Sequence, residues 1–395
     1  MKNGNRQAVL SLFGCCMSVI WAGYLAFGYP GMMGTYWQEK YDVGAAETGS
    51  VVTFMLFALA VSMFFSGRIH MKLGMRKCIL IGTVFIAAGM LILMNGKSIY
   101  SVYIWGFVTN IGCSFTYGPG LTTAQQWFPE RRGLASGIVN FVFGISAAVL
   151  SPLWNNVMEA AGYEKLNLIL LISIAGTNII AMLFAATPDK TDGPEDEKAA
   201  QNDLTTGQAL RTRDFWLIWI IWVFMGAAGI SMVSLSKSYA LSLGISGIAV
   251  LSAFNLVSGC SRIVVGALSD IIGGERIGVI AFAVTAAGYA LLPYIGTGAA
   301  VMVIAGCVGF GFGTLFTVTG PIASGRFGLR YFGMIYGLIF TAYGFIGGIL
   351  GPALSGMVLD ITSGNYHVVF GYLAVFAFIG AALMYVLQRG SKSRA

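Results

Sequence analysis

The stretch that decides the fold is GRIHMKLGMRK at residues 67–77, which has a second copy, GALSDIIGGER, at residues 266–276. Each copy follows a long apolar run, begins with glycine and ends in a basic residue. The second copy carries Asp270 where the first carries Met71. The second copy begins 199 residues after the first in a chain of 395, so this stretch indicates an internal duplication.

Two further patterns recur at nearly the same spacing. Five positions in one apolar run reappear 200 residues later, namely Gly133, Gly137, Gly144, Leu150 and Pro152 against Gly333, Gly337, Gly344, Leu350 and Pro352. The pair Gly118-Pro119 is matched by Gly320-Pro321. Three matches in one order predict two copies of one helical unit. We assign the glycines to close helix packing, as in small-xxx-small spacing.

Composition places the chain in a membrane. It is 57% hydrophobic and 10% charged, whereas soluble domains carry about 25% charged residues. Charge-free runs, each long enough for a span of about 20 residues, cover 7–38, 48–67, 78–96, 98–129, 133–158, 166–188, 215–236, 238–269 (except Arg262), 277–325, 331–359 and 361–388. The run 277–325 is too long for one span and breaks near Pro293. We therefore expect an all-α membrane protein with twelve transmembrane helices.

Basic residues predict the topology. If both termini are cytoplasmic, 18 of the 23 Lys and Arg residues fall on the cytoplasmic side, four fall outside and Arg262 lies in a span. The polar segment 189–213 divides the spans into six and six, so we expect bundles at 1–188 and 214–395 joined by a cytoplasmic linker. Tandem six-helix repeats are typical of transporters whose site lies near the bilayer midplane.

Several functions are not supported by the sequence. The net charge of +7 comes from basic residues at span ends rather than from one patch, so no nucleic-acid partner is expected. The six cysteines lie in or beside apolar runs without metal-ligand spacing, and no Walker loop occurs. We expect no cofactor, no metal and no enzymatic activity. His70 and His367 are expected to be solvated.

Arg262 is the principal candidate for a binding residue. It is the one charged residue between Ser238 and Ser269. A guanidinium at mid-membrane depth costs about 2.5–3.5 kcal/mol, so it normally faces a cavity and a partner. We expect that partner to be an anionic substrate rather than a group of the protein. The alternative is an arginine that braces the bundle through backbone carbonyls or Asp270.

Other candidates share faces with Arg262 or recur by the repeat. Asn255 lies two turns before Arg262, and Asn140 is the repeat counterpart of Phe340. Tyr336, Phe340 and Tyr343 form one aromatic stripe at i, i+4, i+7 spacing. Further candidates are Tyr117 in the fourth span and Tyr24 and Tyr29 in the first. Gly28 and Pro30 should loosen that first helix, and Trp37 is expected at the membrane interface. Packing in the core is the ordinary alternative for each of these.

The two glycine-to-basic stretches resemble the signature of the major facilitator superfamily. Within it, WFPERRGLASG at residues 127–137, Arg262 and TAYG at residues 341–344 resemble the oxalate/formate antiporter and monocarboxylate porter groups. The resemblance implies a charge lock at the cytoplasmic loops, for which this chain offers Arg68, Lys72, Arg76, Asp270, Arg131 and Arg132. For the oxalate carriers, the resemblance also implies a lysine at the position that Tyr343 occupies in this chain. Without that second cation, a monoanion is favoured over a dianion.

We therefore expect a carrier of small monocarboxylates of the lactate, pyruvate or formate class, working by rocker-switch alternating access. The alternatives are a dicarboxylate exchanger of the oxalate type and an exporter of amphipathic drugs. The expected partners are a small organic anion, a proton in the symport case and the lipid bilayer. The expected location is the cytoplasmic (inner) membrane, and the expected state is a monomer. No carboxylate lies in a span core, so proton coupling through such a group is not expected.

Overall fold

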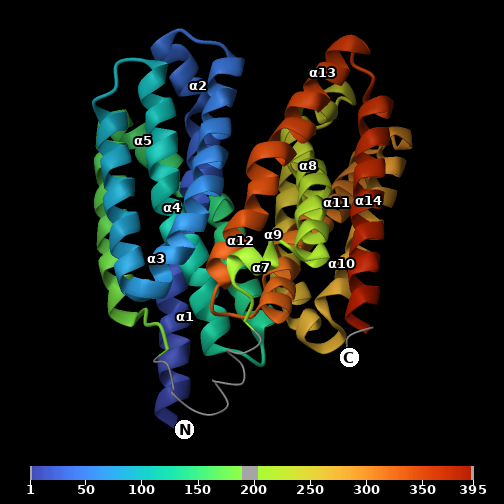
Figure 1. The fold of residues 1–395 in the computed structure, drawn as a ribbon. Helices are drawn as coiled ribbons and strands as arrows, with labels where there is room; N and C mark the ends of the chain where they lie inside the picture. Colours follow the sequence, from blue (N-terminus) through green and yellow to red (C-terminus); the bar gives the residue numbers. More distant parts are fainter. Residues whose placement is uncertain (1, 189–202, 393–395) are drawn as a thin grey trace. The chain divides into compact units, whose positions relative to one another are not determined.

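The computed structural model describes residues 2–188 and 203–392, and in these ranges every regular element is a helix (Figure 1). Of the expected linker 189–213, residues 189–202 lie outside the described residues. In chain order the elements are α1 (Lys2–Gly23), η1 (Tyr24–Gly28), α2 (Tyr29–Tyr41), α3 (Ala45–Met94), α4 (Ile99–Trp127), α5 (Arg132–Phe184), α7 (Thr206–Ala209), α8 (Arg213–Ser242), α9 (Gly247–Ile272), α10 (Gly274–Leu291), η2 (Leu292–Tyr294), α11 (Gly298–Phe327), α12 (Phe332–Thr341), η3 (Ala342–Gly347), η4 (Ile349–Ala353), α13 (Leu354–Ile361) and α14 (Tyr366–Lys392).

Two of the continuous elements are each two membrane spans. The 50 residues of α3 would extend about 75 Å as a straight helix, far more than the roughly 30 Å of a bilayer core. Gly74 interrupts α3 with φ +72°, and Gly162 interrupts α5 with φ +78°. The chain reverses direction at Gly74, because both halves of α3 pack against the same helix. Met55 of the first half lies against Gly106 of α4, and Ile86 of the second half lies against Gly112 of α4. Glycine is required at such positions because a positive φ strains other residues.

The twelve predicted spans are confirmed. Nine helices of the described chain are long and apolar enough to cross a membrane, and two of them, in α3 and α5, are double. The remaining span is α4, whose 29 residues are long enough but include many Ser, Thr, Asn and Gln side chains. The predicted break near Pro293 falls in η2, between α10 and α11. The chain is thus a multi-pass membrane protein.

The helices form two compact units. Unit 1 contains Met1–Pro129, Val142–Thr205 and Phe327–Leu338, and unit 2 contains Glu130–Phe141, Thr206–Arg326 and Ile339–Ala395. Each unit therefore includes one helix start from the other half of the sequence: α5 begins in unit 2, and α12 begins in unit 1. These two helix starts carry the repeated glycines at residues 133 and 333.

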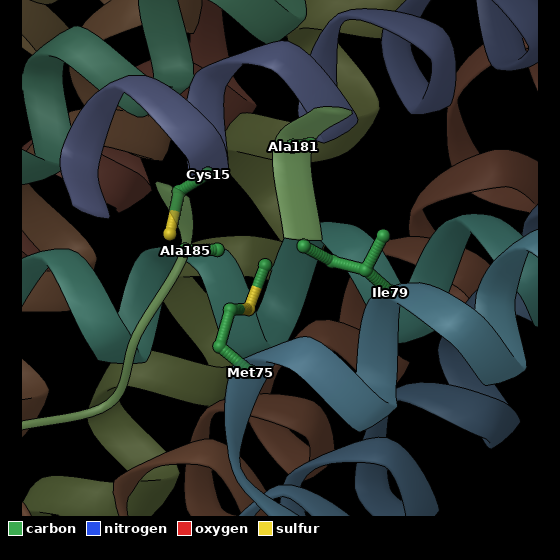
Figure 2. Packing of buried hydrophobic residues seen from close by; sticks show 5 residues of the cluster. All are labelled: Cys15, Met75, Ile79, Ala181 and Ala185. Carbon is green, nitrogen blue, oxygen red and sulfur yellow. The ribbon is translucent and has the colours of Figure 1, made fainter. Parts of the chain in front are cut away.

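Small residues bring the helices of unit 1 close together. Figure 2 shows Cys15 of α1 packed against Met75 and Ile79 of α3, against Ala181 of α5 and against Ala185 just after α5, all fully buried. A Cβ added at Gly14 would lie 2.6 Å from the backbone nitrogen of Ala185, closer than any side chain tolerates. Cys15 acts here as a small apolar residue.

Two spans depart from α-helical hydrogen bonding at their prolines. The first span contains the π-turn η1, which ends two residues before Pro30, and the eleventh contains η3 and η4, the latter including Pro352. Proline lacks an N–H and crowds the carbonyl four residues earlier, so the local ladder shifts. The predicted loosening of the first helix therefore takes the form of a π-turn over Tyr24–Gly28.

Candidate functional site

Arg262 lies on α9 in unit 2 with 5% of its surface exposed. Its Nη1 donates a hydrogen bond to the backbone carbonyl of Asn140 at 2.8 Å. The Asn140 side chain in turn donates from Nδ2 to the carbonyl of Phe316 at 3.1 Å. The expectation that no group of the protein partners Arg262 is therefore wrong, because backbone geometry puts a carbonyl within reach. That carbonyl is neutral overall and helps to solvate the guanidinium.

Glycines make the approach of α5 to α9 possible. A Cβ at Gly137 would lie 2.5 Å from the carbonyl oxygen of Arg262, and one at Gly266 would lie 2.6 Å from that of Gly133. Backbone is present at both places, so a larger residue would force the helices apart. The assignment of these repeated glycines to helix packing is confirmed. Their packing places the Asn140 carbonyl beside α9.

An aromatic cluster adjoins the guanidinium. The Cζ atom of Arg262 lies 4.9 Å from the centre of the Phe316 ring, a cation–π distance. Ring centroids 4.9–6.0 Å apart link Phe316 to four further rings, which also contact one another. They belong to Trp222 of α8, Phe312 of α11, Phe340 of α12 and Tyr343 of η3. We call these five residues the aromatic box.

Trp222 is fixed within the box. It is fully buried, and its Nε1 donates to Oγ1 of Thr319 at 2.9 Å. The Thr319 hydroxyl donates onward to the carbonyl of Leu315. Because the indole N–H is satisfied, the ring is held in one orientation against Phe340 and Tyr343. Box and guanidinium together form a site with one cationic group and an apolar, polarisable wall.

Three of the candidates from the sequence contact Arg262 or the aromatic box. Asn140, Phe340 and Tyr343 are in this constellation. Asn255 is exposed on α9 rather than enclosed with Arg262. Tyr336 belongs to unit 1, where it stacks on Phe332 with centroids 5.3 Å apart.

Sequence reasoning missed Trp222, Phe312 and Phe316. Phenylalanine and tryptophan are ordinary membrane residues, so their identity alone carries no signal. One signal did exist for Trp222: it lies nine residues into α8, about 14 Å along the helix, well away from the interface where tryptophan is usual.

The tyrosines of the first span lie in unit 1. Tyr29 donates its hydroxyl proton to Oδ1 of Asn167, and its ring contacts Trp37 and Trp105 at 6.0 and 5.2 Å between centroids. Tyr24 contacts Tyr29 edge to face, and Tyr117 stacks on Phe143 at 4.4 Å. Trp37 is 1% exposed within this group, so its ring packs against protein side chains.

Asp270 contacts the start of α5 rather than a basic side chain. Its two oxygens accept hydrogen bonds from the backbone N–H groups of Gly133 and Leu134 at 2.7 and 2.8 Å. These amides belong to the first turn of the helix, so they have no hydrogen-bond partner within it, and they form the positive end of its dipole. The carboxylate therefore joins α9 to the start of α5 in unit 2.

The basic residues of the expected lock behave differently. Arg76 donates from Nε to the Ala185 carbonyl at 2.7 Å, and Arg132 donates to the Ser324 carbonyl at 3.4 Å. Arg68, Lys72 and Arg131 are exposed. His70 is 3% exposed and shares a hydrogen bond with Thr123, so the expectation of a solvated His70 is wrong.

The known proteins that are similar to this chain include membrane transporters. A family model described as Major Facilitator Superfamily matches residues 15–352. The chain is 28% identical over 321 residues to the oxalate:formate antiporter of Oxalobacter formigenes, covering 79% of this chain and 75% of that protein. It is 25% identical over 393 residues to monocarboxylate transporter 13 of Rattus norvegicus, covering 94% and 87%. The resemblance predicted from the sequence is confirmed.

Solved structures support the fold. The proton:xylose symporter XylE bound to 6-bromo-6-deoxy-D-glucose superposes with a TM-score of 0.75 at 11% identity, covering 97% of this chain and 96% of that chain. The human organic anion transporter MFSD10 superposes with a TM-score of 0.67 at 14% identity, covering 96% and 99%.

Proposed function

Because this chain belongs to the major facilitator superfamily and is a membrane transporter rather than an enzyme, we propose that it carries small monocarboxylates with Arg262 as the anchor. The observation that supports this most is the pairing of an enclosed guanidinium with the aromatic box. One full positive charge next to apolar rings matches a small anion that has one carboxylate and a short carbon body. A guanidinium forms two parallel hydrogen bonds to a carboxylate and stays protonated at ordinary pH.

Charge matching favours a monoanion. A single bound carboxylate matches the single positive charge of the Arg262 guanidinium. The resemblance to the oxalate/formate group implies a lysine at the position of Tyr343, so in this chain the second charge of a dianion would face phenol and phenyl rings instead of a cation. Desolvating a charge without a partner is strongly unfavourable. The oxalate-type exchanger is therefore the second candidate, favoured only by the similarity to a protein of that name.

The site must open for substrate to enter. With 5% of its surface exposed, Arg262 is enclosed by rings and backbone in this structure. We take the two six-helix halves, 1–188 and 214–395, as the moving bodies of an alternating-access cycle, with the π-turns of the first and eleventh spans as the flexible points. The distribution of basic residues supports cytoplasmic termini in an inner membrane, and a monomer suffices for this cycle.

Uptake into proteoliposomes tests the proposal. Labelled lactate, pyruvate and formate would be offered to the wild type and to the Arg262→Ala and Arg262→Lys variants. We expect uptake to be lost in Arg262→Ala and strongly reduced in Arg262→Lys, because an ammonium lacks the planar fork. The matched control is Arg389→Ala, which removes an exposed arginine that also lies over a ring, that of Tyr385 at 4.8 Å.

The outcome separates the candidates. Wild-type uptake by Arg262→Ala would refute the assignment of Arg262. Uptake of oxalate in preference to the monocarboxylates, with the same dependence on Arg262, would favour the exchanger. Competition by hydrophobic cations but not by short acids would indicate a drug exporter of the same fold.

A further inference from the structure

The two repeated helix starts make the same close contact but differ in their charges. In unit 2, Gly133 at the start of α5 lies against Gly266 of α9. In unit 1, Gly333 at the start of α12 lies against Gly67 of α3, where an added Cβ would be 2.3 Å from the Gly333 carbonyl carbon. Each pair is a backbone-to-backbone contact. The two pairs are repeat counterparts, 200 residues apart in one helix and 199 in the other.

The carboxylate that accompanies the contact in unit 2 has no counterpart at the corresponding motif position in unit 1. Asp270 lies four residues after Gly266 and binds the start of α5. The residue four after Gly67 is Met71, an exposed thioether that offers no charge and only a weak acceptor. In unit 1, a carboxylate beside the contact between α3 and α12 must therefore come from another part of the chain.

A carboxylate from the end of the linker reaches this place. Asp203 accepts a hydrogen bond from the backbone N–H of Arg330 at 3.3 Å, and the next residue, Leu204, donates to the carbonyl of Phe327 at 3.0 Å. Gly328 has φ +83°, and a Cβ built there would lie 1.6 Å from Oδ1 of Asp203. The carboxylate thus fills the space beside Gly328, so glycine is needed there for its φ and for this contact.

We infer that Asp203 takes over in unit 1 the role that Asp270 has in unit 2. It acts as a positioning residue that fixes the turn at residues 327–331 and so holds the start of α12 against α3. The two contacts differ in one respect. Asp270 binds first-turn amides, whereas Asp203 binds the turn two residues before α12, whose Met334 and Ile335 amides already bond to the Tyr331 carbonyl. Asp203 therefore acts on the turn rather than on the helix dipole.

The consequence is a conformational role for the last residues of the linker. Alternating access requires helix contacts at one end of the bundle to form in one state and part in another. We call the contact between Asp203 and the turn at residues 327–331 the clamp. This clamp stabilises the state in which α3 and α12 touch. Removing it should favour their separation, whatever anion is carried, so this inference stands or falls independently of the monocarboxylate assignment.

Hydrogen–deuterium exchange on the full-length protein in nanodiscs, without substrate, tests the clamp. In Asp203→Ala we expect amides of residues 327–338 to exchange about fivefold faster, the factor that one hydrogen bond of ordinary net strength gives. Peptides from residues 132–141 should be unchanged. In Asp270→Ala, exchange should be faster at residues 132–141 and unchanged at residues 327–338. Asp360→Ala, which removes an exposed carboxylate of α13, should change neither region.

A rescue variant makes the test sharper. In the double variant Asp203→Ala/Met71→Asp, a carboxylate returns at the motif position, and we expect exchange at residues 327–338 to slow again toward the wild-type rate. Unchanged exchange at residues 327–338 in Asp203→Ala, with a normal melting profile, would overturn the inference. Fast exchange that persists in the double variant would overturn the equivalence with Asp270.

Discussion

Arg262 and Asn140 are joined by a 2.8 Å hydrogen bond from a guanidinium nitrogen to a backbone carbonyl, across 122 residues of sequence. The bond links α9 to the start of α5, and the Asn140 side chain continues it to the Phe316 carbonyl on α11. Three helices of unit 2 are therefore connected through two residues. This hydrogen bond orients the guanidinium beside the Phe316 ring.

Asn140→Ala is expected to weaken this connection without removing it. The variant keeps the backbone carbonyl that binds Arg262 but leaves the Phe316 carbonyl without its amide donor. Losing a buried donor costs about 1–3 kcal/mol. We expect a lower melting temperature and weaker binding of monocarboxylate, both measurable by thermal shift with and without lactate. An unchanged melting temperature would show that the Asn140 side chain adds nothing.

Gly137→Ala should push α5 away from α9. The new methyl group would lie 2.5 Å from the Arg262 carbonyl oxygen, and relieving the clash costs about 1–3 kcal/mol. We expect lower stability and slower uptake. Gly176→Ala is the matched control, because that glycine also lies in α5 but has no atom within 4 Å of the added carbon. Equal effects of the two variants would argue against close packing at Gly137.

Trp222→Ala should change which acids bind. Removing the indole opens space beside Phe340 and Tyr343 while leaving Arg262 in place. We expect butyrate and longer acids to gain affinity relative to formate, as measured by competition against labelled lactate. Trp216→Ala, a change at an exposed tryptophan of the same helix, should leave that order unchanged. A uniform loss for all acids would mean that Trp222 supports the fold rather than shaping the site.

Tyr29→Phe should affect stability more than binding. The hydroxyl donates to Asn167 and is enclosed by Trp37 and Trp105, so it joins α2 to the second half of α5. Losing this hydrogen bond should cost about 0.5–1.5 kcal/mol. We expect a lower melting temperature with an unchanged dissociation constant for lactate. A large loss of affinity would restore Tyr29 as a substrate contact.

Much of the fold follows from the sequence because its determinants are local or periodic. Charge-free runs locate the spans, and the repeat spacing at Gly67 and Gly266 shows that the unit is duplicated. The double helices of α3 and α5 separate at Gly74 and Gly162, the latter in a charged interval between predicted spans. These features depend on hydropathy and backbone freedom, which sequence carries directly.

The site is predictable only in part, because it depends on contacts between distant residues. Arg262 stands out as a charge in an apolar run, and Phe340 and Tyr343 follow from their spacing. The Asn140 carbonyl leaves no trace in the sequence, since every residue has one. The prediction of a solvated His70 is wrong because residue type suggests solvent, whereas tertiary packing buries the side chain.

Binding of lactate compared with lactamide tests the central claim most directly. The two molecules have nearly the same shape, but only lactate carries a charge for Arg262. On wild-type protein we expect lactamide to bind about 100-fold more weakly than lactate, and we expect Arg262→Ala to abolish that difference. Equal binding of both molecules to the wild type, or a preference for lactate that survives in Arg262→Ala, would contradict the role of this guanidinium.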